Sequence, residues 1–79
     1  MHLHDAFFRE LPEEKQFFDY GVRTDGQPVY FGHASLNMLT SAPEWILSFF
    51  KYNVGNCVTE IYCLKGSWDN RVALFVGYV

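Results

Sequence analysis

The chain lacks a basic cluster. Its Lys and Arg residues number six, are scattered along the sequence, and leave a formal net charge of −3. They are Arg9, Lys15, Arg23, Lys51, Lys65 and Arg71. A surface that follows a phosphate backbone needs a basic patch or stripe. The sequence therefore predicts no binding to nucleic acid.

Long apolar runs are missing as well. The longest apolar stretches fall far short of the about 20 residues that a membrane-spanning helix requires. The N-terminus carries His2, His4 and Asp5, where a signal peptide would have Lys or Arg followed by an apolar run. We therefore expect no membrane attachment. The protein should be cytoplasmic, or delivered from the cytoplasm into a virus particle.

Cysteine is scarce, with only Cys57 and Cys63 present. If both lie on one strand, their Cα atoms are about 20 Å apart, whereas a disulfide needs Cα atoms closer than about 7 Å. The two residues would point to the same face of that strand and pack there as small, buried, reduced thiols. The sequence predicts no disulfide between them.

Motifs for catalysis and metal binding are also absent. No Gly-rich phosphate loop and no nucleophile elbow occurs. A metal site needs three or four convergent ligands, and His2 and His4 form only a terminal pair that is distant from His33. A thiolate–imidazole pair of Cys57 or Cys63 with His33 is disfavoured, because an apolar strand raises the pKa of a thiol. We expect no enzymatic activity, no metal and no cofactor.

Aromatic residues, by contrast, make up 19% of the 79 residues. One domain of this size, spanning residues 1–79, buries only about 60% of its unfolded surface, and each large ring buries about 150–250 Å². Some rings should therefore line a surface, where an aromatic patch usually marks an interface. We expect a homo-oligomer, a dimer or larger, because closed symmetric assemblies are common. The alternative is a monomer with half-exposed tyrosines.

The first half of the chain predicts a short helix and a hairpin. Leu11 to Phe18 begins with a proline and two acids, as a helical turn prefers. After it, apolar stretches flank Asp25-Gly26, a dipeptide that suits a tight hairpin turn. Phe18, Tyr20 and Val22 would share one face of the first strand of this hairpin.

Residues 41–52 admit two interpretations. Ser41 and Glu44 fit a capping box, which would start a helix with Trp45, Phe49 and Tyr52 along one stripe. The same aromatic residues favour a strand. Residues 53–56 are turn-like and residues 57–64 are strongly β in pattern, so a strand–turn–strand hairpin is equally consistent with the residues.

The C-terminal part predicts a last strand over residues 68–79, after a turn at residues 65–67. Val72 to Val76 is apolar on both faces, which indicates a strand covered on both sides. The expected fold is mainly β: a small antiparallel meander or sandwich-like sheet of about five strands with a short N-terminal helix. The alternative is an α+β fold with a helix at Ser41–Tyr52 packed on an antiparallel sheet.

The polar stretch Trp68-Asp69-Asn70-Arg71 is the main candidate for a ligand or interface site. On a strand, Asp69 and Arg71 would point to one face and pair with each other or with a neighbouring strand. Trp68 would pack at the edge of the core, and Asn70 would satisfy the loop backbone. This interpretation makes the stretch a strand entry.

Two functional interpretations of the same stretch remain. A tryptophan beside a carboxylate, an amide and a guanidinium could stack on a sugar ring and bond its hydroxyls, as a carbohydrate site would. Trp68 and Arg71 are also typical anchors of protein–protein interfaces. Trp45 and Tyr52 are further ligand or interface candidates.

The stretch from Trp45 to Leu74 follows the pattern W-x-L-x-x-F-x-Y-N-x-x-x-x-V-T-x-I and then W-D-N-R-x-x-L. This pattern resembles that of small bacteriophage, prophage and mobile gene-cassette (integron-type) proteins, although the spacing before Trp68 is shorter here. Asp19 to Ala34 also resembles their hairpin. The resemblance implies a β-rich fold in which Trp45–Tyr52 is a strand, a mobile-element origin and no catalytic activity. The expected function is that of a self-associating structural or binding module.

Overall fold

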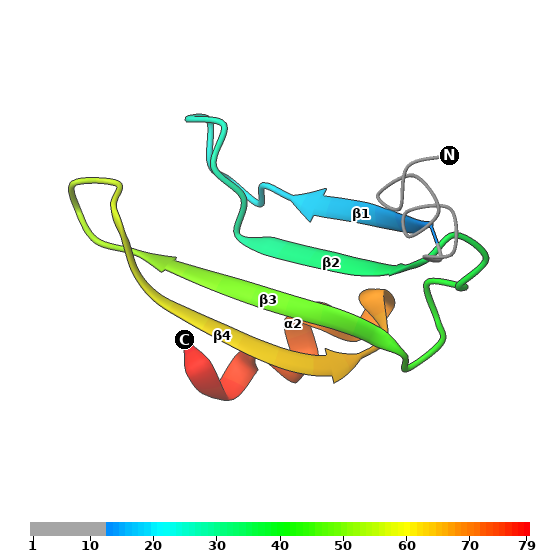
Figure 1. The fold of residues 1–79 in the computed structure, drawn as a ribbon. Coiled ribbons are helices and arrows are strands. Elements are labelled where there is room, and N and C mark those ends of the chain that lie inside the picture. Colours follow the sequence, from blue (N-terminus) through cyan, green and yellow to red (C-terminus); the bar gives the residue numbers. More distant parts are fainter. Residues whose placement is uncertain (1–12) are drawn as a thin grey trace, which may run out of the picture.

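The computed structural model describes residues 13–79 (Figure 1). Its strands are β1 (Glu14–Asp19), β2 (Tyr30–Ser35), β3 (Trp45–Tyr52) and β4 (Val58–Gly66). They are followed by the 3₁₀ helix η1 (Trp68–Asn70), the short helix α2 (Arg71–Leu74) and the 3₁₀ helix η2 (Val76–Tyr78). None of the helices in this part of the chain has the length and apolarity needed to cross a membrane.

The strands form one antiparallel sheet in the order β1-β2-β3-β4, and the C-terminal helices lie against one of its faces (Figure 1). The expectation of a mainly β, antiparallel meander is confirmed. The expected strand count differs, because the described chain forms a sheet of four strands. This sheet is covered by helices and not by a second sheet.

Residues 45–52 form a strand, so the alternative of a helix at Ser41–Tyr52 is wrong. The inward residues Trp45, Leu47 and Phe49 are buried and alternate with more exposed neighbours. This period of two fits residues that pack well on a pleated surface. Pairing on both sides, with β2 and β4, satisfies the backbone of β3.

The predicted N-terminal helix is wrong over residues 14–18, which belong to β1; residues 11 and 12 lie outside the described part. The burial of β1 alternates residue by residue, with Lys15, Phe17 and Asp19 more buried than their neighbours. Helix-start signals are worth little energy beside an unbroken antiparallel register with β2.

The predicted last strand is also wrong, because residues 68–78 are helical. The apolar residues 72–76 point to different sides of this helical segment. Leu74 and Phe75 pack inward, while Val72 and Val76 are exposed. A short run that is apolar on two sides fits a buried helical segment as well as a strand. Here the helical form covers a sheet face that would otherwise be bare.

The core lies between the sheet and these helices. Its buried side chains are Ala34, Trp45, Leu47, Phe49, Trp68 and Phe75. The layers approach closely at two glycines, since a Cβ on Gly32 would lie 2.7 Å from Cε3 of Trp68 and one on Gly66 would lie 2.4 Å from Leu74. The absence of side chains at these positions lets the helical segment sit directly on the strands.

The predicted hairpin around Asp25-Gly26 joins β1 and β2, but its connection is longer than a tight turn and runs over residues 20–29. Gly21 and Gly26 take positive φ angles of 56° and 81° in it. Val22, expected on a strand face, lies in this loop and is fully exposed. Turn residues 53–56 and the strand after them are confirmed.

The second face of the sheet, which we call the open face, carries no helix or strand of residues 13–79. Phe18, Ile46 and Ile61 project from it and are 41–56% exposed. Cys63 also projects here, with its Sγ 3.5 Å from the hydroxyl of Ser48. Both cysteines are free and exposed, so the expectation of buried thiols on one strand is wrong: nothing described covers Cys63, and Cys57 lies just before β4.

Candidate functional site

The stretch Trp68–Arg71 is a helical turn that follows β4. The hydroxyl of Ser67 accepts a hydrogen bond from the backbone N–H of Asn70 at 3.3 Å and so caps η1. Serine is a preferred residue at this position because it satisfies an otherwise free donor. The four side chains therefore project around a turn, whereas a strand would have alternated them between two faces.

Trp68 points into the molecule and is 9% exposed. Its ring packs edge-on against Phe17, with centroids 5.6 Å apart, and tilted against Trp45 at 5.9 Å. Its six-membered ring also lies under Gly32. Trp68 thus packs at the edge of the core. The strand-entry interpretation placed it there too, but on a strand and not on a helical turn.

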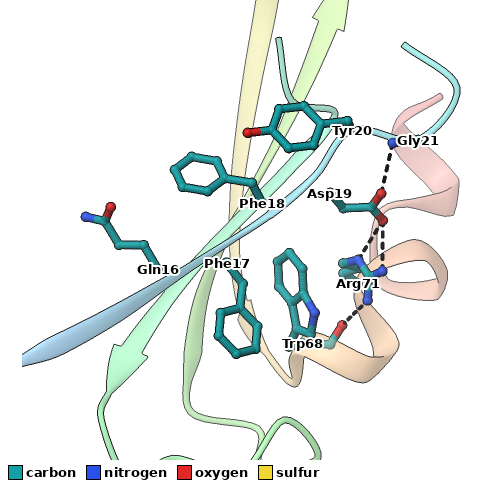
Figure 2. Close-up of a pocket in the computed structure, with 8 residues that line it drawn as sticks. All are labelled: Gln16, Phe17, Phe18, Asp19, Tyr20, Gly21, Trp68 and Arg71. Carbon is teal, nitrogen blue, oxygen red and sulfur yellow. Dashed lines mark hydrogen bonds and ion pairs between the residues drawn. The ribbon is translucent and has the colours of Figure 1, made fainter. Parts of the chain in front are cut away.

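Arg71 joins the helical turn to β1 (Figure 2). Its guanidinium lies 4.3 Å from the ring centroid of Trp68. Nε donates to a carboxylate oxygen of Asp19 at 2.9 Å, Nη2 lies 2.8 Å from the same oxygen, and Nη1 donates to the carbonyl oxygen of Trp68 at 3.0 Å. The neighbouring-strand partner expected for this stretch is therefore Asp19.

The other oxygen of Asp19 accepts a hydrogen bond from the backbone N–H of Gly21 at 2.9 Å. The pKa of Asp19 lies below its usual value of 3.8, and the bond from Gly21 is the largest cause. Partial burial raises this pKa, and the Arg71 guanidinium lowers it. The carboxylate is held in its charged form between the first loop and the helical turn. It fixes the end of β1 to the C-terminal segment.

We expect Arg71→Met to lower the free energy of unfolding by about 1–2 kcal/mol at neutral pH, because it leaves a half-buried carboxylate without its partner. The pKa of Asp19 is lower in the folded protein than its usual value. The stabilisation is therefore complete above that usual value and is lost as the pH falls through the folded pKa. Urea titrations from neutral to acidic pH measure it.

Glu44→Gln is the matched control for this prediction, because Glu44 makes an exposed ion pair with Lys65 at 2.8 Å. Its removal should cost less than about 1 kcal/mol. A cost of Arg71→Met that stays constant from neutral to acidic pH would contradict the role assigned to Asp19.

Asp69 and Asn70 are exposed. Asp69 faces the loop between β2 and β3, where its backbone N–H donates to the carbonyl of Thr40 at 3.0 Å and its carboxylate accepts from the Thr40 hydroxyl at 3.3 Å. The side chain of Asn70 makes no capping bond; Ser67 takes that role. The structure thus brings the side chains of Trp68 and Arg71 together and directs those of Asp69 and Asn70 elsewhere.

The remaining candidates, Trp45 and Tyr52, lie apart on β3. Trp45 is fully buried in the core, and its indole N–H donates to the carbonyl of Leu39 at 2.9 Å. Tyr52 donates its hydroxyl to the carbonyl of Pro28 at 2.5 Å, and burial raises the pKa of this hydroxyl. Neither ring is presented on the open face as a ligand platform.

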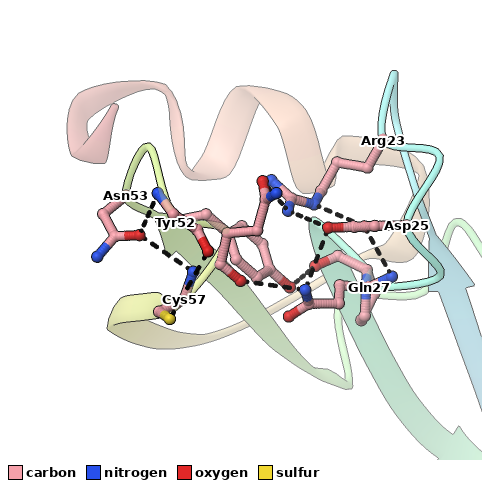
Figure 3. Close-up of polar contacts among 9 residues, drawn as sticks. Arg23, Asp25, Gln27, Tyr52, Asn53 and Cys57 are labelled. Carbon is pink, nitrogen blue, oxygen red and sulfur yellow. Dashed lines mark hydrogen bonds and ion pairs between the residues drawn. The ribbon is translucent and has the colours of Figure 1, made fainter.

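A polar cluster at the tips of the two hairpins was not predicted from the sequence (Figure 3). Arg23 lies 3.6 Å from the ring centroid of Tyr52, pairs with Asp25 at 2.5 Å, and donates to the side chain of Asn56 at 3.2 Å. Gln27 donates to the backbone carbonyl of Asn56. These bonds tie the two loops together and use most of the polar groups that a ligand would need.

A shallow hollow of about 570 Å³ runs beside the outer edge of β1 (Figure 2). The residues that line it are Gln16, Phe17, Phe18, Asp19, Tyr20, Gly21, Trp68 and Arg71. Successive residues of a strand point to opposite faces, so the hollow borders both faces of the sheet. Trp68 and Arg71 therefore lie beside the edge of β1 with which no strand of residues 13–79 pairs.

Within residues 13–79, no three His, Cys, Asp or Glu side chains converge as metal ligands would. His33 pairs with Glu14 at 3.0 Å on the open face. Comparison with known proteins finds no matching family model, no matching curated protein and no matching solved structure.

Proposed function

We propose that this chain is a non-enzymatic, self-associating structural or binding module in which a second copy covers the open face of the sheet. The bacteriophage and gene-cassette pattern of the sequence supports a mobile-element origin, with the cytoplasm or a virus particle as its location. The observation that carries the proposal is the distribution of large and small side chains over the open face.

One row of residues crosses the open face from edge to edge. The register aligns Phe18 of β1 with Phe31 of β2, then with Ser48 of β3 and Cys63 of β4. The row is thus bulky over β1 and β2 and small over β3 and β4. The two phenylalanine rings contact each other, with centroids 5.0 Å apart.

A two-fold axis parallel to the strands would place β1 over β4 of a second copy and β2 over β3. Phe18 would then face Cys63 of the second copy, and Phe31 would face its Ser48. Packed sheets lie about 10 Å apart with interdigitating side chains, so large residues facing small ones fill that space. Such an interface is isologous, as closed dimers require.

Charge agrees with the same arrangement. Glu14 on β1 and Lys65 on β4 both project from the open face, near the same end of the sheet and on opposite edges. The two-fold rotation brings Glu14 of each copy toward Lys65 of the other. Two such pairs favour this orientation over one that would place like charges together.

The test is the mass of the protein in solution by light scattering over a range of concentrations. We expect a dimer or larger, and we expect Ile46→Glu with Ile61→Glu to weaken association at least a hundredfold, because it buries charges in an apolar interface. Val72→Glu is the control, since Val72 is exposed on the helical side. A wild-type protein that stays monomeric at high concentration would overturn the proposal.

The carbohydrate alternative has weaker support. A sugar stacks on a free ring face, but Trp68 is covered on one side by the Arg71 guanidinium and packed against Phe17 and Trp45 elsewhere. The donors of Arg71 are engaged with Asp19 and the backbone. Self-association is therefore the function that the described surface favours.

A further inference from the structure

The outer edge of β1 differs from the edges that soluble proteins usually protect. In the sheet of residues 13–79, no strand pairs with it. Edge strands are commonly blunted by proline, by bulges, or by charged side chains on the edge, including charges that point inward. Residues 14–19 contain no proline, and their register with β2 has no shift, whereas the pairing of β3 with β4 has one.

The one lysine of β1 does not guard this edge. The ammonium of Lys15 donates to the carbonyl of Met38 at 2.5 Å and lies 5.5 and 5.4 Å from the ring centroids of Phe17 and Trp45. It is folded back over the subunit's own aromatic residues. Within residues 13–79, neither a strand nor the ammonium of Lys15 pairs with the backbone N–H and C=O groups that face outward from β1.

The surroundings of the edge fit an added strand. The hollow beside β1 borders both faces of the sheet, so it has room for side chains that alternate above and below a new strand. Phe17 faces the core side but is only half-buried because its strand is the last of the sheet. A neighbouring strand would complete its cover.

We propose that β1 pairs antiparallel with β1 of a second copy about a two-fold axis at Phe17, so that two four-stranded sheets become one continuous sheet. In this register Lys15 lies opposite Asp19 of the second copy, and Phe17 lies opposite its own equivalent. Main-chain hydrogen bonds supply the affinity, as in strand addition at other sheet edges.

The choice of register follows from charge. A two-fold axis on an antiparallel pair must set residues of the same face opposite one another. Centring the pair on Gln16 would place Lys15 against Phe17, and centring it on Phe18 would place Phe17 against Asp19. Of these three axes, only the one at Phe17 pairs opposite charges, twice per dimer. Lys15 would leave the carbonyl of Met38 to reach Asp19 of the second copy, which Arg71 of that copy also contacts.

This contact goes beyond the association of open faces proposed above, because it uses a different surface and can be tested separately. In the face-to-face dimer β1 lies over β4 of the second copy, so the two β1 strands are at opposite edges, about 14 Å apart across the sheet. In the edge-to-edge pair they are adjacent. Cysteines placed on β1 therefore report the edge contact only.

The experiment uses the full chain with Cys57→Ser and Cys63→Ser, to which Gln16→Cys or Phe18→Cys is added. Both positions are exposed on β1. In the proposed register residue 16 lies opposite residue 18 of the second copy, within the Cα distance of about 4.4–6.8 Å that a disulfide needs. We expect mild oxidation to crosslink a mixture of the two proteins and to crosslink neither protein alone.

Each other result overturns the proposal in a definite way. Crosslinking of the Gln16→Cys protein alone would place the axis at Gln16, and crosslinking of the Phe18→Cys protein alone would place it at Phe18. Absence of crosslinks in every sample would exclude edge pairing. Light scattering of the wild-type protein and of Ile46→Glu with Ile61→Glu tests association of the open faces separately, so failure of edge pairing is distinguishable from failure of the proposed function.

Charge reversal gives a second measurement. We expect Lys15→Glu to lower the crosslinked fraction of the mixture about tenfold relative to Lys15→Gln, since it turns two attractive pairs into repulsive ones. Both substitutions remove the ammonium that lies over Phe17 and Trp45, and they differ in the charge that they present to Asp19 of the second copy. Equal crosslinking by the two variants would contradict the register.

Discussion

Phe75→Ala should cost about 3–5 kcal/mol of the free energy of unfolding. Phe75 is fully buried, and its ring contacts Phe49 at a centroid distance of 5.5 Å and Tyr30 at 6.1 Å. It is the main side chain by which the segment after α2 adheres to the sheet. A chain of this length has a total stability of about 4–12 kcal/mol, so the variant should be largely unfolded in moderate urea.

The measurement is urea unfolding followed by tryptophan fluorescence. Val76→Ala is the matched control, because Val76 is the next residue along the chain and is exposed. Its substitution should change the stability by less than about 0.5 kcal/mol. Similar midpoints for Phe75→Ala and Val76→Ala would mean that the C-terminal helices do not cover the sheet.

Gly32→Ala should cost about 1–3 kcal/mol, although it adds only one methyl group. The new Cβ would lie 2.7 and 2.9 Å from ring atoms of Trp68 and 3.0 Å from a methyl carbon of Leu47. Neither neighbour can move freely, because Trp68 is held between other rings and Leu47 is fully buried. Without this conflict the same change would stabilise the protein by restricting the unfolded chain.

The assignment to Trp68 can be tested by a double-mutant cycle. Phe at position 68 lacks the outer ring of tryptophan, so Gly32→Ala should cost at least about 0.5 kcal/mol less in a Trp68→Phe background than in the wild type. Gly77→Ala is the control, since no atom lies within 4 Å of its added Cβ. Strictly additive costs would show that the clash lies elsewhere.

Much of the sheet could be predicted from local patterns. The strand after residue 56 alternates in the way that a half-covered sheet requires, and Asn53 to Asn56 forms the expected turn. The hairpin around Gly26 was visible because a glycine there suits a positive φ. In these segments the local preference and the final environment agree. For residues 45–52 the local pattern left helix and strand open, and only the resemblance implied the strand that is observed.

The C-terminal segment could not be predicted, because its conformation depends on what it covers. Val72 to Val76 is apolar throughout, and its period is ambiguous over so short a length. What decides for the helix is the space above Gly32, which is far away in sequence, and above Gly66 at the end of β4; these two positions admit Trp68 and Leu74. Residues 14–18 form a strand for a similar reason, because their conformation depends on pairing with β2 and not on the local helix signals.

The candidate site was predicted in part. Arg71 was expected to pair with a neighbouring strand, and it does, but its partner Asp19 is distant in the sequence and no local signal identifies it. The tight packing of Trp68 could not be foreseen for the same reason. The contact between the two hairpin tips through Arg23 and Asn56 was missed altogether.

The order of the elements along the chain has a consequence for synthesis. A ribosome completes all four strands at Gly66 before it makes Trp68 and Phe75, which cover the sheet. Until these residues pack on the strands, a sheet of β1 to β4 has an apolar surface on both sides, and a folding intermediate of this kind is the one most exposed to chaperones and to aggregation.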